Sequence, residues 1–182
     1  MLSSGNIPGA VYLVAVSALV TTTFSIPIAL ANDIEDKILG QIACGHLPDP
    51  TPIILDLREQ GRIGTGDALR ADSRSCWPFS PPLKIGSVGF SHICVSHENP
   101  DEVERYPDLY ERGPGTSPGT SIGLIGGKSI GAVERWAAKT LPAGAAGYLI
   151  EESYMVDGAV EIYCNSLYRG DTPSDGGGNA SD

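Results

Sequence analysis

The chain has 182 residues and a formal net charge of −10, from 12 basic and 22 acidic side chains. An acidic protein is repelled by phosphate backbones, and no run of basic residues offsets this charge, so the composition argues against nucleic acid as a partner. The length and an apolar fraction of 41% suit one domain with one sizeable core.

The N-terminal segment has the pattern of a secretory signal peptide. No charged side chain precedes Asp33, and an apolar block ends at the small-x-small triplet Ala29-Leu30-Ala31. This order predicts a signal peptide over residues 1–31 and a location in the periplasm or outside the cell. The segment before the apolar block has no Lys or Arg, so the alternative is an uncleaved membrane anchor over residues 10–31. A stretch of about 20 apolar residues is long enough to span a bilayer.

Four cysteines follow the proposed cleavage site: Cys44, Cys76, Cys94 and Cys164. An even number of cysteines in an exported chain indicates two disulfide bonds. Their spacings do not resemble the C-x-x-C pairs of zinc or redox sites. Four cysteines allow three connectivities, and of these we expect Cys44–Cys76 with Cys94–Cys164.

The first elements of the chain are expected to be helices. Residues 32–45 have isoleucines at helical spacing, Asn32 as a cap and a terminating glycine: Ile34, Ile38, Ile42 and Gly45. Thr51-Pro52 fits the cap and first position of a second, short helix that Gly61 ends. A strand at Ile53–Leu57 is the alternative.

The middle of the chain is expected to alternate between loops and one strand. Residues 61–82 predict a long irregular loop that Cys76, Trp77 and Phe79 pin to the core. Residues 83–96 are apolar on both sides, which predicts a central strand, and two glycines suggest a bulge or break in it: Gly86 and Gly89. Residues 96–113 are acidic and predict a loop.

The C-terminal half predicts a strand, a helix and a hairpin. The strand is expected at residues 120–124, and the helix at residues 129–141, with Ser129 as its cap. Residues 148–168 predict a hairpin, because apolar residues flank Asp157-Gly158, a dipeptide favoured in type I′ turns. After Arg169 the chain is rich in Gly, Ser, Asp and Asn, which predicts a disordered tail.

The two-residue turn also predicts which hairpin residues face the core. It pairs Glu151 with Cys164 and so places an acid on the apolar face. Either the register is shifted, or Glu151 lies at the sheet edge, or it is a buried acid with a raised pKa. On the opposite face Tyr154 and Tyr163 would mark a partner surface or be covered by a helix.

The stretch from Gly119 to Gly131 resembles two catalytic motifs. A phosphate loop needs a glycine five residues before the Gly-Lys pair, but that position is Ile122. The G-x-S-x-G pattern centred on Ser121 lacks an immediately following helix, so it does not fit a nucleophile elbow. We therefore interpret the stretch as a glycine-rich connection. His92 and His97 are the candidate bases if Ser121 is nevertheless a nucleophile.

A metal site at His92-Ile93-Cys94 is the remaining chemical alternative. On a strand, His92 and Cys94 point the same way, as two ligands of one metal would. His46 could supply a third imidazole, but nothing in the sequence places it nearby, and an oxidised Cys94 would lose its thiolate. No metal and no cofactor are therefore predicted.

Together these expectations describe one exported α+β domain over residues 32–169, with a tail at residues 170–182. The domain should have a mostly antiparallel sheet of three to five strands, two or three helices and two disulfides. The expected function is a non-enzymatic binding or interaction module for an unknown protein or small ligand. The alternative is a small secreted hydrolase that uses Ser121 with His92 or His97. Membrane association is expected only if the N-terminal segment is uncleaved.

Overall fold

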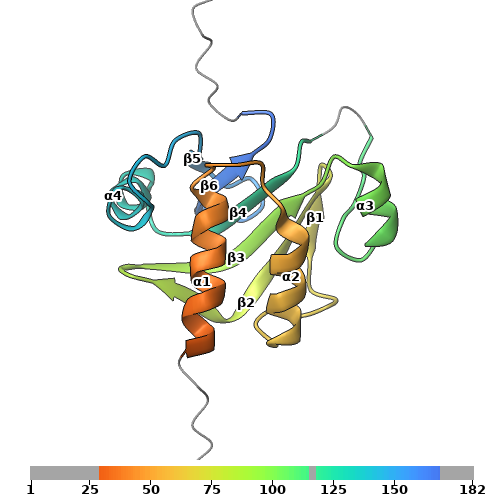
Figure 1. Cartoon of the computed structure of the whole chain (residues 1–182), viewed down its shortest axis with the longest axis horizontal. Coiled ribbons are helices and arrows are strands. Elements are labelled where there is room, and N and C mark those ends of the chain that lie inside the picture. Colours follow the sequence, from red (N-terminus) through yellow and green to blue (C-terminus); the bar gives the residue numbers. More distant parts are fainter. Residues whose placement is uncertain (1–28, 115–117, 169–182) are drawn as a thin grey trace, which may run out of the picture.

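A computed structural model describes residues 29–114 and 118–168 (Figure 1). The expected tail and most of the expected signal peptide or anchor, residues 1–28, lie outside the described residues. Residues 29–31 of the expected signal peptide form the start of helix α1 (Ala29–Ile42). Within the described residues, none of the helices has the length and apolarity needed to cross a membrane.

In residues 29–114 and 118–168, six strands form one curled antiparallel sheet in the order β1-β2-β3-β4-β6-β5. Their bounds are β1 Leu69–Ala71, β2 Arg74–Ile85, β3 Val88–Ser96, β4 Ser121–Gly126, β5 Leu149–Glu152 and β6 Val160–Asn165. The mixed α and β composition and the antiparallel sheet are confirmed, but the sheet is larger than the expected three to five strands. The last strand, β6, is inserted between β4 and β5.

Four helices occur in the described parts of the chain, one more than the expected maximum. Helices α1 and α2 (Pro50–Glu59) lie on one face of the sheet. In the view of Figure 1, α4 (Ile130–Thr140) lies to the left of the sheet and α3 (Pro100–Arg105) to its right. The strand alternative at Ile53–Leu57 is wrong, because these residues are helical. Helix α3 interrupts the predicted acidic loop, and the Asn99 side chain caps it by accepting a hydrogen bond from the Asp101 amide.

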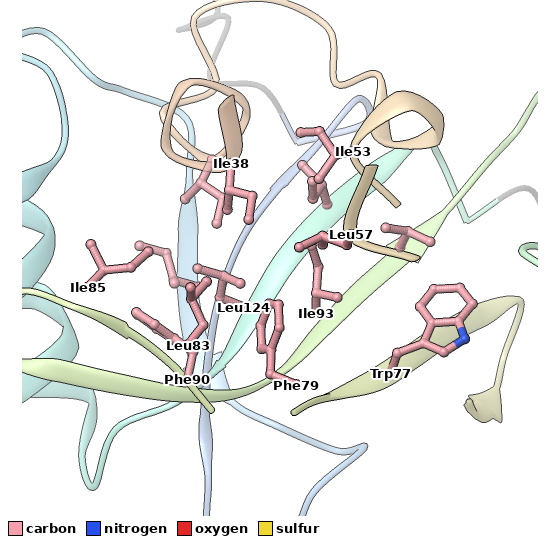
Figure 2. Packing of buried hydrophobic residues seen from close by; sticks show 14 of the residues in the cluster. Ile38, Ile53, Leu57, Trp77, Phe79, Leu83, Ile85, Phe90, Ile93 and Leu124 are labelled. Atoms are coloured by element: carbon pink, nitrogen blue, oxygen red, sulfur yellow. The ribbon is translucent and has the colours of Figure 1, made fainter. Parts of the chain in front are cut away.

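The main core lies between α1, α2 and the sheet (Figure 2). Ile38 of α1 and Leu57 of α2 are fully buried above Ile93 and Leu124 of the sheet. Burial of each such side chain stabilises the fold by about 1.5–3 kcal/mol. Helix α4 joins the same core through Trp136, whose indole N–H donates to the Ile85 carbonyl at 2.8 Å.

Strand β2 overturns the prediction of an irregular loop over residues 61–82. Trp77 and Phe79 are buried as expected, but they lie on a strand. Prolines interrupt this strand's sequence pattern, and the pairing with β3 shifts register between Pro78 and Leu83. The predicted break at Gly86 is confirmed, because the chain turns there at a φ of +57° between β2 and β3.

The predicted register of the hairpin is also wrong, because the observed pairing differs from it by three residues. Strands β5 and β6 are joined by residues 153–159, called the 153–159 connection below, and Glu151 pairs with Glu161 instead of Cys164. A shift of three residues exchanges the two faces of a strand. Hydrogen bonds within the connection favour the longer turn: the Ser153 amide donates to the Ala159 carbonyl at 2.8 Å, and the Ser153 hydroxyl accepts from the Met155 amide at 3.2 Å.

Two disulfides are confirmed, but the expected pairing is wrong. The bonds are Cys44–Cys164 and Cys76–Cys94. Cys76 and Cys94 are direct cross-strand partners on β2 and β3, with their Cα atoms 4.0 Å apart. Cys44 follows α1, which packs against β6, and this brings its Cα to 5.3 Å from that of Cys164. Two such bonds are compatible with an oxidising compartment.

Candidate functional site

The side of the sheet opposite α1 and α2, called the second face below, carries a row of polar side chains. Strand alternation and the observed register place the following residues on it: Arg74, Cys76, Cys94, Ser96, Ser121, Gly123, Ile125, Glu161, Tyr163 and Asn165. The 153–159 connection packs on this face. Its Met155, Val156 and Ala159 contact a small cluster made by the Cys76–Cys94 disulfide and Ile125.

A buried ion pair lies at the centre of the second face. Arg74 of β2 reaches across the sheet, and its Nη2 pairs with Oε1 of Glu161 on β6. The two side chains are only 8% and 0% exposed. The guanidinium carbon also lies 5.0 Å from the centre of the Tyr163 ring, within range of a cation–π contact. Oε2 of Glu161 and Nε of Arg74 are buried without a hydrogen-bond partner among the described residues.

Gly123 makes room for this ion pair. A Cβ atom on Gly123 would lie 2.5 Å from Oε1 of Glu161 and 2.7 Å from Cβ of Tyr163. Both distances are closer than carbon and oxygen atoms tolerate without rearrangement. The glycine that the G-x-S-x-G pattern pointed to therefore has a packing role: it leaves space for an arginine and a glutamate above the sheet.

Glu161 has the raised pKa that was considered for Glu151. Burial raises the pKa of Glu161, the carboxylate of Glu151 directly opposite raises it further, and Arg74 opposes both effects. Glu151 itself is exposed at the sheet edge. The sequence could have identified Glu161 as the buried acid only with the correct register, because Glu151 and Glu161 both lie in short strands and nothing in the local sequence distinguishes them.

The two tyrosines predicted on one exposed face differ in the structure. Tyr154 is 53% exposed, as expected, but Tyr163 is 7% exposed and lies against Arg74. Burial raises the pKa of the Tyr163 hydroxyl, and the charge of Glu151 adds to that effect. The prediction of a surface made by both tyrosines is therefore wrong for Tyr163.

An open cavity of about 540 Å³ lies between the start of α4 and the 153–159 connection. Lys128 and Ser129 line it on the α4 side, and Glu152 and Asp157 line it on the side of β5 and the connection. The Gly-Lys-Ser end of the glycine-rich stretch thus borders a hollow, although it lacks the spacing of a phosphate loop. The cavity presents charges of both signs to solvent.

The structure separates the predicted nucleophile Ser121 from His92, the first of the two candidate bases. Ser121 is 1% exposed, and its hydroxyl lies 2.7 Å from that of Ser96, its cross-strand partner. His92 pairs with Ile125 and lies four residues before Ser96 on β3. This places it roughly 13 Å from the Ser96–Ser121 pair. Burial lowers the pKa of His92, whose Nδ1 lies 2.8 Å from the Ser91 hydroxyl.

The second candidate base, His97, follows Ser96, the cross-strand partner of Ser121, but its ring contacts other residues. Its ring packs edge-on against Tyr110 at 5.2 Å between ring centres, and its Nδ1 accepts a hydrogen bond from the Asn99 amide at 3.2 Å. For a metal, Cys94 offers no thiolate because it is bonded to Cys76. The described residues contain no group of three or more His, Cys, Asp or Glu placed to hold a metal ion.

Comparison of the chain with protein-family models, with curated proteins and with solved structures finds no match. The geometry of the cavity and of the second face is therefore the basis for a functional proposal.

Proposed function

We propose that this protein is an exported, non-enzymatic binding protein whose ligand occupies the cavity between α4 and the 153–159 connection. The observation that carries this proposal is the open hollow of about 540 Å³, a size typical of small-molecule sites. None of the candidate catalytic residues Ser121, His92 and His97 lines this cavity, and Ser121 and His92 lie about 13 Å apart along the sheet.

The charges on the cavity walls favour a particular class of ligand. Lys128 can attract an anionic group, while Glu152 and Asp157 can attract a cationic one. A small polar ligand that carries both kinds of group, such as a free amino acid, satisfies all three side chains. A purely apolar ligand would leave these charges desolvated without partners, which costs binding energy.

Binding is tested by recording amide NMR spectra of the disulfide-bonded protein with each free L-amino acid in turn. We expect one or more of them to shift the signals of residues 127–131 and 152–160. Lys128→Met should weaken that binding by about tenfold, as loss of one charge-assisted contact does. Lys139→Met is the matched control, because Lys139 lies in the last turn of α4, at the opposite end of that helix from Lys128, so this variant should bind as wild type does. Unchanged spectra with every amino acid would rule out this ligand class.

The export half of the proposal rests on the N-terminal pattern and on the two disulfides. It is tested by the intact mass of protein from its native compartment, with thiol alkylation under denaturing, non-reducing conditions. A mass that begins at Asn32 with no alkylation supports export and cleavage. A mass that begins at Met1 contradicts cleavage and favours the membrane anchor, and alkylated cysteines contradict an oxidising compartment.

The non-enzymatic half is tested with an activated ester such as p-nitrophenyl acetate. We expect hydrolysis no faster than in buffer with wild type and with Ser121→Ala alike. Hydrolysis by wild type that Ser121→Ala abolishes would overturn the proposal and restore the secreted hydrolase.

A further inference from the structure

Two carboxylates face each other where the 153–159 connection leaves the sheet. Glu151 lies two residues before the connection and Glu161 two residues after it, and they are direct cross-strand partners on β5 and β6. Like charges in directly opposed positions destabilise a strand pair. The repulsion therefore acts at the base of the connection, where the two strands must stay together for it to keep its place.

The surroundings of Glu161 compensate its charge only in part. The titratable or charged groups that face it are Arg74 of β2, Glu151 of β5, Tyr163 of β6 and Tyr154 of the connection. His92 of β3 lies on the same face, with Ile125 of β4 between them. Arg74 pairs with Oε1 alone, and no residue in the described part of the chain donates a hydrogen bond to the buried Oε2.

We propose that Glu161 is a proton-operated clamp: proton uptake by this carboxylate removes its repulsion with Glu151 and tightens β5, β6 and the 153–159 connection as the pH falls. Protonation adds one hydrogen to a carboxylate oxygen and breaks no bond. Protonation also gives up the charge attraction between Glu161 and Arg74, but the cost of burying the Glu161 charge is the larger of these two effects. The contact of Arg74 with the Tyr163 ring does not depend on the charge of Glu161.

The direction of the effect follows from burial. Burial and Glu151 raise the pKa of Glu161 in the folded protein, so the closed structure holds the proton more tightly than an opened one. The stability that the proton contributes is complete below the ordinary pKa of a glutamate and is lost as the pH rises through the raised value. An arginine-paired carboxylate on a protein surface shows the opposite trend, because its pKa is lowered and its contribution is lost in acid.

The clamp acts on the 153–159 connection, which contributes to both the exposed surface and the cavity wall. The connection carries the exposed Tyr154, and its Asp157 and Gly158 form part of the cavity wall. A looser connection at high pH therefore changes both the surface around Tyr154 and the shape of the cavity. The clamp operates whether or not the cavity binds a ligand.

Hydrogen–deuterium exchange of single amides, corrected for the intrinsic pH dependence of exchange, tests the clamp in the full, disulfide-bonded protein. The Ser153 and Ala159 amides are the reporters, because each donates a hydrogen bond that closes the connection. We expect their protection to rise by roughly three- to tenfold between about pH 8 and about pH 5. Protection that stays constant or falls over this range overturns the proposal.

Three variants separate the clamp from general stability. Glu161→Gln should make protection independent of pH, and Glu151→Gln should raise protection at neutral pH and lower the midpoint of the remaining change. Glu152→Gln is the matched control, since it removes the same charge from the next residue, which pairs with Val160 on the other side of the strand. An effect of Glu152→Gln equal to that of Glu151→Gln would show nonspecific charge repulsion and contradict the clamp. If Glu161→Gln fails to fold, the proposal is still tested by the pH dependence of protection in the wild-type protein and by the change in its midpoint in Glu151→Gln.

Discussion

The two faces of the sheet are stabilised in different ways, although each holds one disulfide. The face under α1 and α2 is apolar, and Cys44–Cys164 ties the end of α1 to it. The second face buries an arginine and a glutamate beside Cys76–Cys94. Apolar burial depends on area and tolerates small shifts, whereas a buried ion pair is favourable only when its geometry is right. The apolar face therefore contributes stability that depends little on exact geometry, whereas the ion pair of the second face requires the observed strand register.

The largest expected difference between the faces concerns their disulfides. Replacing Cys44 and Cys164 by serine should lower the free energy of unfolding by about 5 kcal/mol, because loop-closure entropy grows with the enclosed length, here a separation of 120 residues. Replacing Cys76 and Cys94, separated by 18 residues, should cost about 3 kcal/mol. Urea unfolding of the two double variants measures both values. A larger loss for Cys76–Cys94 would show that packing on the second face outweighs loop entropy.

Phe90→Ala tests the apolar face. Phe90 is fully buried and its ring packs edge-on against Trp136, with 4.9 Å between ring centres. Its truncation should cost about 4 kcal/mol through lost burial and a cavity. Because no ionisable group is involved, the loss should be the same at neutral and mildly acidic pH in urea unfolding. A loss that depends on pH would show that the faces are coupled.

Arg74→Met tests the second face. It leaves Glu161 buried without its cation and should cost about 3 kcal/mol at neutral pH. The cost should shrink in acid, because the unpaired carboxyl then takes up a proton that the fold favours. Arg105→Met, which removes an exposed arginine paired with Glu102, is the control and should cost no more than about 0.5 kcal/mol. Equal costs for the two variants in urea unfolding would mean that the ion pair is not buried in solution.

Gly123→Ala is expected to have the smallest effect of the four. The added methyl group meets Oε1 of Glu161 and Cβ of Tyr163, so we expect a loss of about 2 kcal/mol. Gly40→Ala is the matched control, because it adds the same methyl group to α1 where no atom lies within 4 Å. That change should stabilise the protein by about 0.5–1 kcal/mol. Thermal unfolding of both variants gives the comparison, and a neutral Gly123→Ala would refute the packing role of this glycine.

The sequence predicted the apolar face better than the second face, and there is a physical reason. The spacing of Ile34, Ile38 and Ile42 is a local property of one helix, and all three are buried as expected. The Arg74–Glu161 pair joins residues 87 positions apart, so it depends on strand order and on the register of β5 with β6. The Asp157-Gly158 signal gave the wrong register because hydrogen bonds of Ser153 close a longer connection.

The candidate cavity was not predictable for the same reason. Lys128 belongs to the glycine-rich stretch from Gly119 to Gly131. Its neighbours across the cavity, Glu152 and Asp157, come from β5 and the 153–159 connection. The prolines within residues 74–85 led to the prediction of a loop where the structure has β2, the strand that carries Arg74, Cys76 and Trp77. The cysteine pairing followed from which strands are adjacent, and spacing alone does not contain that information.

The position of β6 has a consequence for folding. Among the described strands β6 comes last in the chain but lies between β4 and β5, so the sheet stays incomplete at this position until residues 160–165 have been synthesised. A chain that stops before Val160 lacks an interior strand, the acid partner of Arg74 and the cysteine partner of Cys44. The sheet is therefore completed late, because one of its interior strands is the last of the described strands to be synthesised.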